Sequence, residues 1–502
     1  MNFLDRAIAA VSPERALDRV RARLILDQLR AYDGALMGRR GANWLGSNAS
    51  ANAAIKGDLA RLRARARDVS RNTWWGARIK SVFTAHAVGA GIVPRCKDAP
   101  AAVDLWRKWG KRCDAEGQLN VDGLIALAVG TIFESGEVLP RLKLTQRAGM
   151  PVPLELQLLE PDHLDGSRDR ASSTAIIDQG IQYDAEGRRT AYWILPQHPG
   201  ASPLVMRQVS ISVPAANILH TYKKDRIGQG RGVPWVAPVL LKGKDIADLE
   251  EAVIVKARIE ACLALLIKTN NPTRTLGDAR METSSSGAAR RLETLSPGMV
   301  RYLDNGEEAT VVNPSSSLAF EQVMMNNWMT LAAGAGLTYD QVTGDLSRAN
   351  YSSLRAGKIE FRRLVEQFQW LTLVPMLLDP LWDAFIAAAV EWGALPKRRH
   401  GYPVEWIMPA HEPIDPLKDL QADILAVRSG RMTWPQFCAA WGFDPDKQLD
   451  EIDAWFKKLD AKGIALDCDP RRPMQNPKSI GSQGDPAPAD NQGGDSNANA
   501  QG

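Results

Sequence analysis

Two helical patterns that enclose an insert of different character place the strongest constraint on the fold of this chain. The first covers 236–267 and the second covers 317–333. Residues 268–318 between them are rich in Ser, Thr, Gly and Pro, with strand-forming stretches at 299–303 and 309–312. Two helices joined through such an insert favour an elongated molecule over a compact enzyme.

The rest of the chain predicts a mixed α+β protein that is mainly helical. Alternating apolar residues predict a strand over 154–158, a hairpin from 181–183 and 190–195, and a strand over 217–222, so residues 135–225 form a β-rich part. Further helices are expected at 77–88, 103–109, 124–133, 352–373, 417–427 and 448–459, and from Trp434 onwards. The first is expected to stop at Gly89, and Asn350 or Ser352 is expected to cap the helix that begins near 352.

Charge is distributed unevenly along the 502 residues. Residues 1–80 carry 16 basic and 7 acidic side chains, 81–410 carry 36 of each, and 411–502 carry 10 basic and 15 acidic. The chain therefore runs from a basic end to an acidic end around a neutral middle. Its length indicates several structural units in series, and residues 471–502 have the composition of a disordered tail.

The expected compartment is intracellular, without a membrane partner. The longest apolar runs, 261–267 and 384–390, fall well short of the roughly 18 residues that span a bilayer. The N-terminus lacks the apolar region of a signal peptide. Five scattered cysteines without a C-x-x-C pair indicate free thiols.

Motifs for catalysis, metals and cofactors are not found. None of the three Gly-Lys pairs belongs to a phosphate-binding loop, and G-x-S-x-G and H-E-x-x-H do not occur. Asp162 and His163 are the one pair that merits inspection, and turn chemistry with a hydrogen-bonded histidine is the favoured interpretation. The segment 228–232 resembles a phosphate loop but has the wrong spacing, which favours a turn.

Tryptophan is more frequent than phenylalanine or tyrosine, with 15 residues against 10 and 8. Several of these residues lie in or beside the expected helices. Packing in the core and anchoring of subunit contacts are equally compatible with this pattern. The residues concerned are Trp74, Trp75, Trp106, Trp109, Trp235, Trp370, Trp382 and Trp392.

Several strings, taken in order, resemble one family. Each string is weak alone, but the ordered set over roughly 20–460 is specific, and it is similar to the lambda-family portal proteins of tailed bacteriophages. The strings are ARDVSRN (66–72), GAGIVPR (89–95), ESGEVL (134–139), LQLLEPDHL (156–164), His220 with GQGRGVPW (228–235), AAGAGLTYD (332–340) and GDLSRANYSS (344–353), with Arg355 just beyond.

The resemblance implies a portal fold and a ring of usually twelve subunits at one vertex of the capsid. Double-stranded viral DNA passes through such a ring during packaging and ejection. The implied partners are the terminase large subunit, the major capsid and scaffold proteins, and the head-completion or tail-joining proteins. The implied location is the virion, after assembly in the host cytoplasm. Without a phosphate-binding loop, the ATPase that drives the DNA should be a partner protein.

The resemblance also implies a division of the chain into parts. The DNA channel would be lined by the tunnel loop, with Asp345, Ser347, Arg348 and Asn350 as its candidate residues. Arg348 would lie near DNA or in an intersubunit ion pair. The parts are a basic helical segment (1–59), wing (60–235), stem helix (236–267), clip (268–316), second stem helix (317–336), tunnel loop (337–350), a helix behind the channel with more of the wing (351–414), crown (415–460) and tail (461–502).

Two other functions remain as alternatives. One is a capsid scaffold or adaptor that binds head proteins without forming a channel. The other is a nucleic-acid enzyme that holds its substrate on the basic N-terminus. That enzyme would need a cluster of carboxylates for a divalent metal, whereas the acidic residues are scattered along the sequence.

Overall fold

The computed structural model describes residues 47–171, 176–201, 208–261, 320–347, 350–411, 413, 415–466, 469 and 471, with four strands between 262 and 319. Most of the expected N-terminal segment and the expected tail from 472 onwards lie outside the described residues. The chain divides into two compact units, Met1–Pro416 and Leu417–Gly502.

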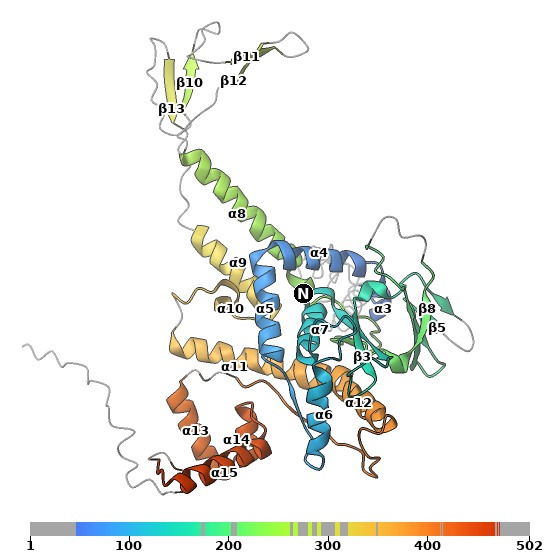
Figure 1. Ribbon diagram of the computed structural model, residues 1–502. Coiled ribbons are helices and arrows are strands. Elements are labelled where there is room, and N and C mark those ends of the chain that lie inside the picture. Colours follow the sequence, from blue (N-terminus) through green and yellow to red (C-terminus); the bar gives the residue numbers. More distant parts are fainter. Residues whose placement is uncertain are drawn as a thin grey trace, which may run out of the picture. The chain divides into compact units, whose positions relative to one another are not determined.

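Three helices of the first unit, α4 (Leu59–Asn72), α5 (Trp74–Val88) and α7 (Val121–Ser135), lie against one another (Figure 1). Thr73 separates the first two, and its hydroxyl accepts a hydrogen bond from Gly76 N at 3.2 Å, which caps α5. As predicted, α5 ends at Gly89, whose φ of 54° favours glycine. The shorter helices α3 (Ala51–Lys56) and α6 (Pro100–Gly110) belong to the same unit.

Two antiparallel sheets confirm the β-rich part. One has the order β3 (Leu154–Leu159), β2 (Glu137–Leu144) and β9 (Thr221–Tyr222), with Leu142 opposite Leu156. The other runs in sequence order and contains the predicted hairpin. Its strands are β4 (Arg170–Ala171), β5 (Ile176–Asp178), β6 (Ile181–Tyr183), β7 (Arg189–Ile194) and β8 (Ile211–Pro214). A separate pair joins β1 (Val93–Arg95) to β14 (Glu405–Ile407).

The long helix expected over 236–267 is shorter than predicted. A 3₁₀ turn (Ala237–Val239) precedes α8 (Leu240–Ala261), and residues 265–269 form strand β10 instead of helix. Strand β10 (Leu265–Thr269) pairs with β13 (Glu307–Val311), so a distant segment of the chain supplies hydrogen bonds that a helix would have supplied locally. The insert also contains β11 (Arg280–Thr283) paired with β12 (Ala289–Leu292), and α9 (Phe320–Ala335) follows it.

A short helix interrupts the segment expected to be a loop over 337–350. Helix α10 (Tyr339–Thr343) begins where Gln341 Oε1 accepts a hydrogen bond from Thr338 N at 3.0 Å, and it ends at Gly344 with φ 74°. Arg78 of α5 donates to Gln341 O at 3.1 Å. These contacts fix 338–344, so this part of the expected loop has a defined conformation.

The next helix continues beyond the expected end at 373. Helix α11 (Tyr351–Phe368) passes into a π-helix, η5 (Gln369–Leu378), and then into α12 (Asp379–Glu391). Pro375 lies in the π-helix, where a proline removes one backbone donor. This wide turn packs on β9, and the hydroxyl of Thr221 donates to Met376 O at 3.3 Å.

Residues Ser352–Glu391 are long and apolar enough to cross a membrane by length and composition, with a mean hydropathy of 1.6 in one window. Uninterrupted apolar runs in the sequence did not reveal this stretch, because charged and polar residues interrupt it. Half of that window is buried inside the molecule. Leu373, Leu377 and Phe385 belong to the main core of the first unit, which accounts for the apolar composition.

The tryptophans of this set differ in burial, and the buried ones confirm the expected packing in the core. Trp75, Trp106, Trp109 and Trp382 are fully or almost fully buried in the core. Trp235 packs partly buried against the same core. Three residues of the set are about half exposed, and a role for them in anchoring subunit contacts stays a prediction: Trp74, Trp370 and Trp392.

The second unit consists of α13 (Pro416–Arg428), α14 (Trp434–Ala440) and α15 (Pro445–Lys462), as predicted. Thr433 caps α14 through a hydrogen bond from Gln436 N. The indole of Trp441 donates to Asp423 at 3.2 Å and ties α14 to α13. Few apolar side chains are buried among the described residues of this unit, and α13 has none.

Candidate functional site

A buried carboxylate, Glu137, lies at the junction between α7 and β2. Helix α7 ends at Gly136, which has φ 90°, and the strand begins at the next residue. A Cβ on Gly136 would lie 2.5 Å from the carbonyl carbon of Val233, so only glycine fits between these two backbones. The side chain of Glu137 is therefore held inside the molecule, with an exposed fraction of 0%.

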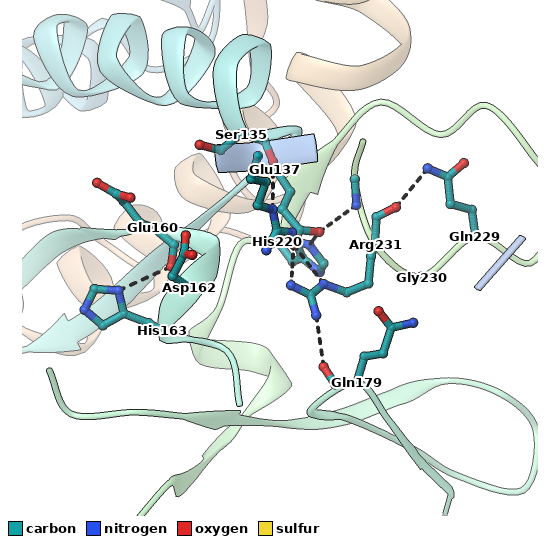
Figure 2. A network of polar contacts seen from close by, with 12 residues as sticks. Ser135, Glu137, Glu160, Asp162, His163, Gln179, His220, Gln229, Gly230 and Arg231 are labelled. Atoms are coloured by element: carbon teal, nitrogen blue, oxygen red, sulfur yellow. Dashed lines mark hydrogen bonds and ion pairs between the residues drawn. The ribbon is translucent and has the colours of Figure 1, made fainter. Parts of the chain in front are cut away.

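Four groups from different parts of the chain converge on this carboxylate (Figure 2). Arg231 Nε donates to Oε1 at 2.8 Å, and Arg63 of α4 donates to the same oxygen. The other oxygen accepts from His220 Nε2 at 2.9 Å and from Gly232 N at 2.6 Å. We call Glu137, Arg63, Arg231, His220 and Gly232 the polar hub.

Charge neutralisation makes this burial tolerable. Burial alone would raise the pKa of Glu137, but the guanidinium groups of Arg231 and Arg63 outweigh it and hold the pKa well below its ordinary value. Burial lowers the pKa of His220 to about 4 despite its hydrogen bond to Glu137. Both guanidinium groups are almost completely buried beside one carboxylate, so an uncharged histidine suits this environment.

A chain of hydrogen bonds defines the tautomer of His220. Arg189 can only donate, and its Nη1 lies 3.3 Å from His220 Nδ1, so Nδ1 is the acceptor. The ring proton is therefore on Nε2, which donates to Glu137. The imidazole thus links the Arg189 guanidinium to the carboxylate as a neutral bridge.

The hub fixes the segment that leads from β9 into α8. Arg231 Nη1 donates to Gln179 O at 3.1 Å, and Gln179 has an unusual φ of 50° in the turn between β5 and β6. Gln229 Nε2 donates to Arg231 O at 2.8 Å, and the Tyr222 hydroxyl donates to Gln229 O at the same distance. The segment 228–232 is thus a turn, as predicted, and one of its backbone groups, Gly232 N, donates to a protein carboxylate.

A second polar cluster contains the Asp162–His163 pair that the sequence singled out. Asp162, Glu160 and His198 bring their ligand atoms within 4.8 Å of one another, a spacing that suits a metal ion. Arg67 of α4 already pairs with both carboxylates, at 2.7 Å from Glu160 Oε2. The guanidinium group of Arg67 thus already supplies the positive charge that a metal ion would supply to these carboxylates.

The tautomer of His198 also disagrees with metal binding. Gly200 N donates to His198 Nδ1 at 3.0 Å, so the ring proton belongs on Nε2, which is the atom that faces Glu160. A metal at Nε2 would need that proton removed and Nδ1 protonated against the Gly200 donor. We therefore interpret the cluster as an ion pair. His163 keeps a bond from its ring to Glu160 O at 3.3 Å, in line with the turn that was predicted.

The candidate channel residues lie around the start of α11. Asp345 Oδ1 accepts from Ser347 N at 2.9 Å, and Ser347 is exposed. Asn350 Oδ1 accepts from Ser353 N at 2.7 Å, which confirms the predicted cap and gives this side chain a structural role. Arg348 lies outside the described residues. The proposed contact of these residues with DNA stays a prediction.

Sequence reasoning did not assign the hub. Four of its five members lay in the quoted strings around 134–139, 220 and 228–235, yet no role was given to Glu137, Arg231 or His220. Arg63 lay outside these strings. The signal available was the paired glycines, Gly136 and Gly232, whose backbones touch. A Cβ on Gly232 would lie 2.1 Å from Gly136 O.

The hub is a set of mutually hydrogen-bonded groups that joins a helix, a sheet and a connecting turn. A family profile described as "Phage portal protein, lambda family" matches residues 37–369, more than half of the chain. The chain belongs to the lambda family of phage portal proteins, and portal proteins are not enzymes.

Relatives of known name agree with this family. The chain is 25% identical to the "Probable portal protein" of Halomonas phage phiHAP-1, covering 87% of this chain and 88% of the relative. It is 22% identical to "Portal protein B" of Escherichia phage lambda, covering 80% of this chain and 84% of the relative. Among solved structures, the neck of a native gene transfer agent particle aligns with a TM-score of 0.43 and 17% identity over 77% of this chain and 93% of that chain.

Proposed function

We propose that this portal protein forms a ring-shaped channel at one vertex of the capsid, through which double-stranded DNA enters during packaging and leaves during ejection. The family match carries the proposal because it contains the whole arrangement of α8, the strand insert and α9. In this proposal α8 and α9 belong to the stem, the insert to the clip and the second unit to the crown.

The exposure of α8 supports a role among neighbouring subunits. Ile246 is buried, but none of the residues from 247 to 258 is. An isolated helix gains little stability from its own hydrogen bonds in water, and most helices in proteins are stabilised by packing of one face. Contacts with neighbouring copies in a ring would supply that packing.

The assembly itself provides the test. Purified protein viewed by electron microscopy should show rings, about twelve subunits each by analogy with the family, with an axial opening. Monomers and dimers alone, over a range of salt and protein concentrations, would contradict the proposal. The proposed partners, terminase and the head-completion or tail-joining proteins, should then bind to rings and not to subunits.

Arg348 gives a test of the channel. Arg348→Glu should lower packaging or retention of DNA while rings form at the parental level, because it reverses a charge in the proposed tunnel loop. Lys358→Glu, an exposed position on α11, is the matched control. Equal packaging by both variants and the parent would remove Arg348 from the channel.

A further inference from the structure

A fully exposed isoleucine stands at the tip of a turn between β9 and α8. Ile227 has an exposed fraction of 101%, the highest among the large apolar side chains that the structure describes. Lys223, Lys224 and Arg226 precede it and are also exposed. We call residues 223–228 the basic turn.

The basic turn is held in one conformation. Gln229 N donates to Arg226 O at 3.2 Å, and Gly228 has φ 79°, which is a type II turn with Ile227 at its second position. The buried Gln229 Oε1 accepts from Asp225 N at 2.9 Å and Arg226 N at 3.0 Å. Because these hydrogen bonds to Gln229 fix the backbone of the turn, Ile227 stays exposed. Little conformational freedom of this turn would therefore be lost on binding a partner.

The turn also carries net positive charge. Lys223 pairs with Asp225 at 2.9 Å, which neutralises one cation. Arg226 donates to the uncharged carbonyl of Ala49 at 3.3 Å, so its charge is not compensated there. Lys224 adds a further exposed cation. A partner for this turn should therefore combine an apolar hollow with acidic side chains.

The outer face of α8 has both properties. Leu241, Asp245, Asp248, Ala252 and Val255 are all exposed and lie within a narrow stripe at helical spacing. This stripe faces away from the side on which Ile246 and Gly243 are buried. We call it the outer stripe of α8.

Three positions of the outer stripe and the neighbouring Glu251 form a hollow of the kind that receives a side chain from another element. Positions i, i+3, i+4 and i+7 surround such a hole on a helix. Asp248, Glu251, Ala252 and Val255 occupy these positions. Ala252 and Val255 give an apolar floor, and the two acids lie beside it. Lys244 pairs with Asp248 at 2.8 Å. Residues 245–255 contain four acidic side chains and no basic one, and the next basic residues of the helix are Lys256 and Arg258.

We propose that the basic turn of one copy docks on the outer stripe of α8 of the neighbouring copy, with Ile227 over Ala252 and Val255. Lys224 and Arg226 would then face Asp248 and Glu251. Two different faces of one chain that complement each other make a heterologous contact, which closes into a ring when the rotation allows it. The inference rests on the proposed ring and names the surfaces that build it.

Charge exchange tests the contact. Lys224→Glu with Arg226→Glu, and Asp248→Lys with Glu251→Lys, should each lower the yield of rings about tenfold, since like charges would then oppose each other. The four changes combined in one chain should restore most of the yield. The thermal stability of the monomeric fraction, followed by circular dichroism, shows that each variant folds.

A disulfide gives an independent test. Ile227→Cys with Ala252→Cys should form a covalent ladder of subunits under mild oxidation, whereas Ile227→Cys with Ala257→Cys should not, because position 257 lies about 140° around the helix. Rings at the parental yield in both charge variants, or equal ladders in the two cysteine pairs, would overturn the contact. Absence of rings in the parent would instead refute the proposed function. Loss of DNA binding with rings intact would show that the turn contacts nucleic acid and would also overturn the contact.

Discussion

Replacing Glu137 by glutamine removes one negative charge from the centre of the polar hub and keeps the shape of the side chain. Arg63 and Arg231 then remain buried without their shared counter-ion, since their side chains are only 7% and 4% exposed. Breaking a buried pair in this way costs about 3–5 kcal/mol. A loss of about 4 kcal/mol lowers the ratio of folded to unfolded protein about a thousandfold.

Urea unfolding followed by tryptophan fluorescence measures this loss. Glu155→Gln is the matched control, because Glu155 is also buried but pairs with Arg147, which is about half exposed. The control should lose about 1 kcal/mol or less.

Hydrogen exchange adds a local measurement to the same variant. Residues 223–235 should lose protection in Glu137→Gln, since Gly232 N donates to the altered side chain. A loss under about 1 kcal/mol, together with unchanged protection of this segment, would refute the role of the carboxylate as the centre of the hub.

Three further changes test neighbouring parts of the molecule. Burial lowers the pKa of His220 from 6.5 to about 4, so the unfolded chain binds a proton at this residue more readily than the folded chain. The free energy of unfolding should therefore fall by at most about 3 kcal/mol as the pH drops from 6.5 towards 4. Acid titration of His220→Gln should show a smaller loss over the same range. Gly136→Ala should destabilise the first unit by more than about 2 kcal/mol in urea unfolding, because it combines a backbone clash with φ 90°. Asn350→Ala should cost about 1 kcal/mol through the lost cap, seen as faster hydrogen exchange at Ser353, with Ser352→Ala as the control; an unchanged exchange rate would argue against the cap.

The helices and the hairpin could be predicted from the sequence because their signals are local. Gly89 ends α5, Asn350 caps α11, and the alternation in β6 and β7 fixes a hairpin through a short turn. The predicted secondary structure was wrong where contacts with residues distant in the sequence determine it. Strand β10 replaces the end of a predicted helix because its partner lies about forty residues further on, beyond any local window.

The polar hub could not be predicted for a related reason. The partners of Glu137 are Arg63, His220 and Arg231, which are separated from it by 74, 83 and 94 positions along the chain. In a sequence, charged residues so far apart cannot be distinguished from ordinary surface groups. Helix α10 was missed for the opposite reason. It is only five residues long, so helical periodicity cannot reveal it.

The position of the hub explains why a chain of this kind keeps a costly buried charge network. Arg231 and Gly232 anchor the last residues before the 3₁₀ turn that starts α8, while Gln229 fixes the basic turn just before them. One carboxylate therefore sets both the direction from which α8 begins and the position of Ile227. Replacing a buried ion network by well-packed apolar residues is often neutral for stability, so we infer that the hub is kept for the direction that its hydrogen bonds impose on this segment. In a ring closed by contacts between that turn and α8, an error in either position would be repeated at every interface, so a directional network of hydrogen bonds suits this junction better than packing alone.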